Sequence, residues 1–281
     1  MLAPIAATDD AQPGSARSGA GKVAVTSADR IMPLVLYRLG RSQVEMGDWT
    51  AAGTTLDRLI REYPGSSRNR EARFLRAEAA LRLNHSAEAE PIFAALAAEP
   101  PKPSDPEGFA RLVHGRHVQS LVGMKRWQDA LSQAEALKVE LPADDPTVAD
   151  LDFARGRALL GLARPEDARN AFQAVINARK GGDLAAQAHL LRGETYFHED
   201  RFREALTEFL KVDILYDAPR WQAAALLEAG KVYERLAQWG DAAETYERLR
   251  SRFPDDPHIP EANTRLITVR KRESAQGNSA G

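Results

Sequence analysis

Cysteine is absent from this chain of 281 residues. The sequence therefore offers no disulfide, no thiolate metal site, no cysteine nucleophile and no lipidated N-terminal cysteine. A chain without cysteine suits a reducing or an oxidising compartment equally well, so this absence leaves the compartment open.

An excess of either charge is also absent, because 38 basic side chains stand against 40 acidic ones and the net charge is -2. Nucleic-acid binders normally carry a basic excess on the binding face. The balance therefore argues against nucleic acid as a partner.

Long apolar runs are missing as well. No stretch approaches the roughly 18 consecutive apolar residues that a membrane-spanning helix needs, so direct membrane insertion is not expected. The opening residues 1–7 are too short for the core of a signal peptide, and no basic residue precedes them. We expect either a cytoplasmic protein or a start that lies upstream of this Met, and the localisation stays unknown.

Residues 1–30 are rich in Ala, Gly, Ser, Pro and Asp and have no apolar period, which predicts a disordered leader. Residues 16–23 partly resemble a phosphate-binding loop. Ala16 and Val23 stand where such a loop needs Gly and Ser or Thr, and no strand or helix is predicted beside it. No cofactor is therefore predicted.

From residue 31 onward a pattern of 37 to 41 residues recurs six times. Each copy has an anchor that is small in five of the six: Gly40, Ala77, Val118, Gly156, Gly193 and Gly230. Twelve residues further on stands an alanine in every copy: Ala52, Ala89, Ala130, Ala168, Ala205 and Ala242. A turn residue follows the anchor by seven positions, and a proline closes four copies.

Each position has a mechanical reason. Small residues fit where two antiparallel helices approach most closely, and large residues four and seven positions beyond the alanine fill the gap to the next copy. Proline ends a copy because it cannot continue a helix interior. The pattern predicts an all-α fold, a right-handed α-solenoid of about six helix pairs.

We place the solenoid at residues 31–272, with copies that begin near 33, 70, 111, 149, 186 and 223. Each copy contributes two helices of about 14 residues. A capping helix is expected at residues 258–272, because the exposed end of a repeat stack needs a cover. A disordered tail is expected at residues 273–281.

The recurring anchor, alanine, aromatic residue and closing proline resemble the tetratricopeptide repeat superfamily over about residues 31–272. Two steps, Tyr63-Pro64-Gly65-Ser66 and Phe253-Pro254-Asp255-Asp256, are similar to those of bacterial cell-envelope members of the Tol–Pal-associated and outer-membrane assembly types. The resemblance implies a scaffold that binds protein, and a periplasmic location if the true N-terminus lies upstream. The lipoprotein cysteine and the N-terminal coiled coil of those relatives are absent.

The resemblance also implies that the first helix of each copy lines a concave groove. Positions three before, one after and four after the anchors would then face a partner protein or peptide. We predict the following partner-binding residues: Tyr37, Arg41, Val44, Phe74, Glu78, Leu81, Gln119, Phe153, Arg157, Leu160, Glu194, Phe197 and Lys231. The alternative for each aromatic member is burial in the core between copies.

Catalytic and metal-binding patterns are scarce. His114 and His117 lie one helical turn apart and could share a metal ion, but no third ligand is evident. No Ser, His and acid arrangement recurs at a motif-like spacing, so we predict neither a catalytic nor a metal site. An enzyme remains a distant alternative.

The favoured hypothesis is a protein-interaction scaffold that holds a partner segment in its groove, with bacterial envelope assembly as the favoured setting. The alternative is a structural spacer in a larger assembly, without a dedicated groove ligand. The oligomeric state is left open.

Overall fold

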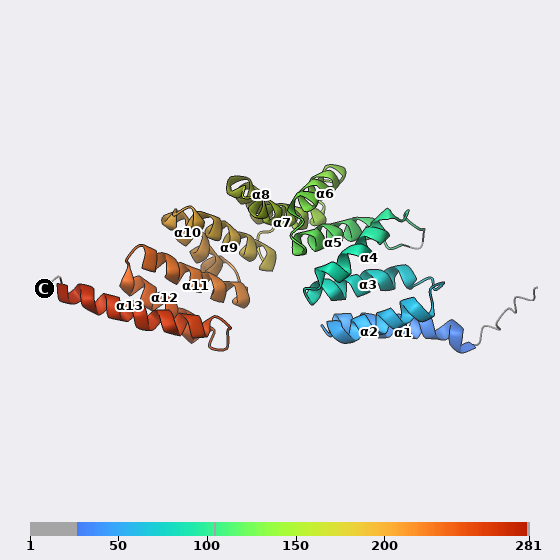
Figure 1. Ribbon diagram of the computed structural model, residues 1–281, viewed down its shortest axis with the longest axis horizontal. Helices are drawn as coiled ribbons and strands as arrows, with labels where there is room; N and C mark the ends of the chain where they lie inside the picture. Colours follow the sequence, from blue (N-terminus) through green and yellow to red (C-terminus); the bar gives the residue numbers. More distant parts are fainter. Residues whose placement is uncertain (1–26, 104, 280–281) are drawn as a thin grey trace, which may run out of the picture.

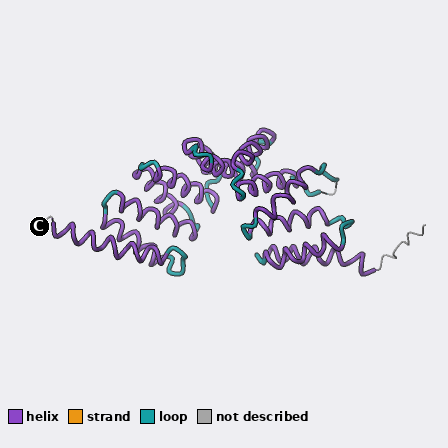
Figure 2. Tube along the Cα trace, in the orientation of Figure 1, coloured by secondary structure: helices purple, strands orange, loops and turns teal. Residues whose placement is uncertain are grey.

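The computed structural model describes residues 27–103 and 105–279, and these residues form thirteen helices and no strand (Figures 1 and 2). The helices are α1 (Ser27–Glu45), α2 (Trp49–Glu62), α3 (Asn69–Arg82), α4 (Ser86–Ala98), α5 (Phe109–Gly123), α6 (Trp127–Glu140), α7 (Pro146–Gly161), α8 (Pro165–Ala178), α9 (Asp183–His198), α10 (Phe202–Leu215), α11 (Pro219–Arg235), α12 (Trp239–Arg252) and α13 (Ile259–Ser279). The prediction of six helix pairs followed by a terminal helix is confirmed.

The pairs follow an arch, with α1 and α13 at its two feet and α6 and α8 on its outer side (Figure 1). Each helix packs on the next one along the chain, and successive first helices also contact one another, as α5 does with α7 and α9 with α11. A small rotation repeated at every copy produces such curvature. The arch therefore bends around its first helices.

The turn between the helices of each pair contains one residue at positive φ, between 55° and 76°. The N–H of the residue that follows it donates to the carbonyl five residues earlier, at 2.8 to 2.9 Å in all six turns. This closure satisfies the free carbonyls at a helix end and needs the left-handed conformation. Only one copy supplies glycine there, and the residues in chain order are Gly47, Asn84, Lys125, Ala163, Asp200 and Ala237.

The anchors lie where the two helices of a pair touch. A methyl group added to Gly156, Gly193 or Gly230 would lie 2.3 to 2.5 Å from the nearest atom of the aromatic ring sixteen residues later. In the third pair the sizes are exchanged, since the anchor is Val118 and the residue sixteen positions on is Ala134. The six recurrent alanines are all buried, with at most 1% of their surface exposed.

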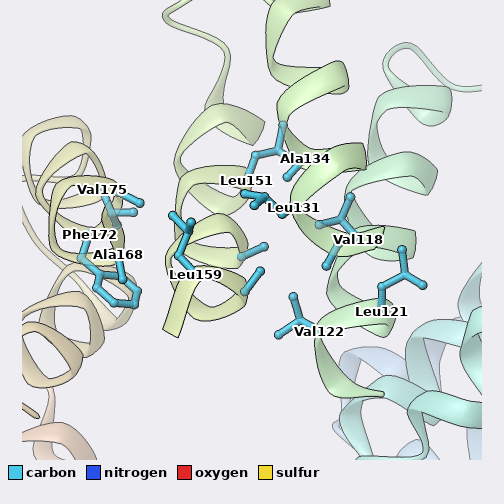
Figure 3. Close-up of a cluster of buried hydrophobic side chains, with 14 of the residues drawn as sticks. Val118, Leu121, Val122, Leu131, Ala134, Leu151, Leu159, Ala168, Phe172 and Val175 are labelled. Atoms are coloured by element: carbon cyan, nitrogen blue, oxygen red, sulfur yellow. The ribbon is translucent and has the colours of Figure 1, made fainter. Parts of the chain in front are cut away.

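The largest core cluster joins two neighbouring copies rather than filling one. Figure 3 shows Val118, Leu121 and Val122 of α5 on one side of this interior and Phe172 and Val175 of α8 on the other. Side chains of α6 and α7 lie between them. Each pair is therefore stabilised mainly by its neighbours, as expected for a repeat stack.

The two ends differ from the predicted boundaries. The predicted leader lies outside the described residues as far as residue 26, and so does the glycine-rich stretch 16–23; α1 already begins at Ser27. Helix α13 continues to Ser279, so the prediction of a disordered tail from residue 273 is wrong up to that point. Arg270 pairs with Glu247, and the Arg272 guanidinium lies 6.0 Å from the ring centroid of Trp239, which extends the contact of α13 with α12.

Candidate protein-binding groove

A cavity of about 540 Å³ lies along the first helices at the middle of the arch. We call it the central groove. Its walls come from four successive first helices, α3, α5, α7 and α9, with the turn before α4 at one edge. The lining residues that the argument below uses are Glu78, Arg82, Arg116, Gln119, Asp150, Phe153, Arg157, Leu184 and Gln187.

The charged side chains at one end of the central groove already form ion pairs with one another. The Glu78 carboxylate is buried and accepts from Arg82 on its own helix at 3.0 Å and from Arg116 on α5 at 2.6 Å. Arg116 also donates to Gln119 at 3.1 Å. Since these groups already have partners within the chain, a ligand would gain little by pairing with them.

The α7 wall is different, because its charges lack close partners. Asp150 has only the Arg179 guanidinium nearby, at 4.0 Å, and burial raises the pKa of its carboxyl above the usual range while Arg116 and Arg179 oppose that shift. Arg157 makes no ion pair or hydrogen bond with any described residue. Its side chain is exposed, although surrounding protein removes part of its hydration and lowers the pKa of the guanidinium.

Phe153 stands one helical turn from both charges and is only half-buried. Its ring centroid lies 5.8 Å from that of Phe172, and the rest of its surface faces the central groove. The α7 wall therefore presents a carboxylate, an aromatic ring and an unpaired guanidinium in a row at i, i+3 and i+7, which is one face of a helix.

A second cavity, of about 390 Å³, lies between α1, α3 and the start of α5, and we call it the N-terminal pocket. Tyr37 and Phe74 line it, but both are more than nine-tenths buried. The Tyr37 hydroxyl donates to Glu71, and burial is the main cause of the raised pKa of this phenol. Phe74 packs edge to face on Phe93 and Phe109, with ring centroids 5.7 and 5.4 Å apart.

In the C-terminal half of the arch, Glu194 on α9 lies near Glu228 and Lys231 on α11. Burial, together with Glu228, raises the pKa of Glu194 to about 7, and Lys231 opposes the shift. Lys231 itself pairs with Glu228 at 2.8 Å and with Glu261 at 3.2 Å. Phe197 packs against the Phe202 ring, with the centroids 5.6 Å apart.

The predicted partner-binding residues thus fall into three sets. The central groove is lined by Glu78, Leu81, Gln119, Phe153 and Arg157. The N-terminal pocket is lined by Tyr37, Arg41, Val44 and Phe74. Neither cavity is lined by the remaining four: Leu160, Glu194, Phe197 and Lys231.

Sequence reasoning missed the groove residues that stand six positions before an anchor, Asp150 and Gln187. They lie one helical turn before the positions considered, on the same face. Extending the counted face by one turn would have found them. Arg82 and Arg116 were missed too, because they lie at the edge of that face and are held there by Glu78.

No three His, Asp or Glu side chains come together to hold a metal ion among residues 27–103 and 105–279. None of the helices that the structure describes is long and apolar enough to cross a membrane. The central groove combines a few desolvated charges with one half-buried aromatic ring.

Two family models described as tetratricopeptide repeat match the chain, one over residues 37–106 and 153–219 and the other over residues 224–256. Together they cover more than half of it. No curated protein matches the sequence.

Several solved structures are similar in fold. PilW, described as a widely conserved type IV pilus biogenesis factor, has a TM-score of 0.62 at 17% identity, and the match covers 82% of this chain and 97% of PilW. PilF of Pseudomonas aeruginosa has a TM-score of 0.57 at 14% identity, over 84% of this chain and 98% of that one. A chain of the Cut9–Hcn1 hetero-tetramer of the APC/C has a TM-score of 0.61 at 12% identity, over 84% of this chain and 43% of that one.

Proposed function

The chain belongs to the tetratricopeptide repeat superfamily and is a protein-interaction scaffold, and we propose that it holds a segment of a partner protein in the central groove. The α7 wall carries the proposal. Aromatic side chains and arginine are enriched at protein interfaces, and arginine is among the residues that most often carry binding energy there.

The proposed segment would place an apolar side chain on Phe153 and a carboxylate at Arg157. Of the groups on the α7 wall, Arg157 would contribute most to binding the segment, because a guanidinium pairs with a carboxylate through two parallel hydrogen bonds. Glu78, Arg82 and Arg116 already satisfy one another at the far end, so they would shape the groove rather than hold the ligand.

Affinity capture with the full chain as bait tests the proposal. The double variant Phe153→Ala/Arg157→Ala should reduce the amount of captured partner at least about 10-fold, since interface anchors contribute roughly 2 kcal/mol or more each. The matched control is Val139→Ala/Arg250→Ala, which removes one apolar and one basic side chain from exposed positions on the second helices α6 and α12.

Both variants should keep the helical circular dichroism of the parent chain. Equal capture by the parent and the groove variant, or loss of capture in the control alone, would remove the central groove as the site. A chain that captures nothing under any condition would favour the structural spacer.

We place the proposed activity in the bacterial cell envelope, in the assembly of a larger structure. The Tyr63-Pro64-Gly65-Ser66 and Phe253-Pro254-Asp255-Asp256 steps support this setting, and so does the similarity in fold to a pilus biogenesis factor. Expression from the natural gene with its upstream sequence, followed by cell fractionation, tests it: recovery only in the cytoplasm would contradict it.

A further inference from the structure

The first helix of the arch and the turn that follows it expose a row of large apolar side chains, which we call the α1 ridge: Ile31, Leu34, Val35, Leu39 and Met46. Ile31, Val35 and Leu39 stand at i, i+4 and i+8, so they follow one line along the helix. In the rest of the described chain, exposed large apolar residues do not occur at this spacing.

In the later copies, the face of the first helix that corresponds to the α1 ridge is covered by another helix. Val35 stands five residues before its anchor and is 47% exposed. The residues at the same position in the later first helices and in α13 are at most 1% exposed: Ala72, Val113, Leu151, Ala188, Ala225 and Ala262. Each packs against the second helix of the preceding pair. On α1 the same face has no preceding helix within the described residues.

The residue just before the anchor indicates which kind of helix can cover this face. Where this residue is polar, the covering helix places a polar group beside it: Arg76 pairs with Asp57 at 3.0 Å and Arg155 with Glu135 at 3.5 Å. Where it is apolar, as at Ala229, the covering helix α10 presents apolar side chains, Leu206 and Leu210 at i and i+4. The equivalent residue on α1 is Leu39, so its cover must be an apolar ridge.

The other foot of the arch does not provide such a ridge. The corresponding open side of α13 carries one apolar residue, Ile267, among Thr264, Thr268 and Lys271, and all four are exposed. Head-to-tail stacking of α1 on α13 would therefore set an apolar face against a polar one. A growing filament of this kind is disfavoured.

We infer that the α1 ridge is the contact between two copies of this chain, with each α1 covering the other in antiparallel orientation about a two-fold axis. The ridge itself has the apolar i, i+4, i+8 spacing that Leu39 requires of its cover. An isologous contact of this kind closes on itself and leaves the central groove of each copy free.

The dimer is expected to be weak, because one helix from each copy buries less area than a standard interface does. A dissociation constant of about 10–100 µM is expected for such a small contact. Arg38 is exposed on the same side of α1, at the middle of the stretch from Ile31 to Met46. Two-fold symmetry brings the Arg38 side chains of the two copies toward each other, so added salt should strengthen association by screening them.

Sedimentation equilibrium of the full chain between 1 µM and 1 mM tests the inference. We expect a monomer–dimer equilibrium that tightens when NaCl is raised from about 0.05 to 0.5 M. Leu39→Glu should raise the dissociation constant at least 10-fold, and Arg38→Gln should lower it about 2- to 5-fold at low salt. Val139→Glu, at an exposed apolar position on α6, is the control and should change nothing.

Both α1 positions are exposed, so the variants should keep the parent's thermal unfolding curve. A chain that stays monomeric at 1 mM, or a dimer that Leu39→Glu leaves unchanged, would overturn the inference. Failure here is separable from failure of the proposed function, because the capture assay depends on Phe153 and Arg157 rather than on the α1 ridge.

Discussion

Two glycine-to-alanine substitutions in helix interiors should change stability in opposite directions. At Gly53 a methyl group would have only Arg76 Cδ within reach, at 3.9 Å. Gly53→Ala should therefore raise the free energy of unfolding by about 1 kcal/mol, the difference in helix propensity.

At Gly193 the same methyl group would lie 2.4 Å from Cε1 and 2.7 Å from Cδ1 of Phe209. Ordinary carbon contacts are about 3.5 to 4.0 Å, so the ring would have to move by roughly 1 Å. Phe209 is 1% exposed, so its ring is enclosed by other side chains. Overpacking costs about 1–3 kcal/mol, and a displacement this large places the cost near about 3. After the gain in helix propensity, Gly193→Ala should lose about 2 kcal/mol.

Urea denaturation followed by circular dichroism measures both changes, with midpoints compared at equal slope. The Phe209→Leu background supplies the internal check, since a smaller side chain should recover part of the loss caused by Gly193→Ala, with a coupling of about 1 kcal/mol. If Gly193→Ala stabilises the chain as much as Gly53→Ala does, the anchors are not the points of closest approach and the packing argument is refuted.

Lys125→Gly should raise the free energy of unfolding by about 1 kcal/mol by removing a side chain from φ 59°, and chemical denaturation should show no gain if the turn is unstrained. The raised pKa of Glu194, about 7 against an ordinary value near 4.5, means that the folded chain holds this proton more tightly than the unfolded chain does. Stability contributed by the neutral carboxyl is thus lost as the pH rises from about 4.5 through 7, so Glu194→Gln should stabilise the chain at pH 8 and have little effect at pH 4.5. Equal effects at the two pH values would contradict the assignment of the shift to burial beside Glu228. Ala134→Phe should destabilise the third pair by about 1–3 kcal/mol, and Val118→Gly in the same chain should restore part of that loss in thermal unfolding, as the other pairs combine a small anchor with a large partner.

Gly193 and Glu194 are neighbours, yet the predictions for them rest on different information: the sequence pattern for Gly193 and the tertiary structure for Glu194. Gly193 belongs to the recurring pattern, so its role could be predicted from spacing alone and its close approach to Phe209 is confirmed. Glu194 stands one residue after its anchor, as Arg157 does one copy earlier. Its raised pKa follows from burial and from Glu228 on the next first helix, and neither could be predicted from the pattern.

The sequence by itself determined the helices, their turns and the pairing within each copy. These depend on residues within about 25 positions of one another, where helix periodicity, small anchors and turn geometry act locally. Only the tertiary structure decided which first-helix residues remain available to a partner. Tyr37 and Phe74 occupy equivalent positions to Phe153, yet the first two are buried and the third is half-exposed. Their exposure depends on side chains of the next copy, such as Glu71 and Phe109, and on the small rotation between copies. Arg157 is likewise without an ion-pair partner among residues 27–103 and 105–279, which depends on where the acidic side chains of the neighbouring copies lie.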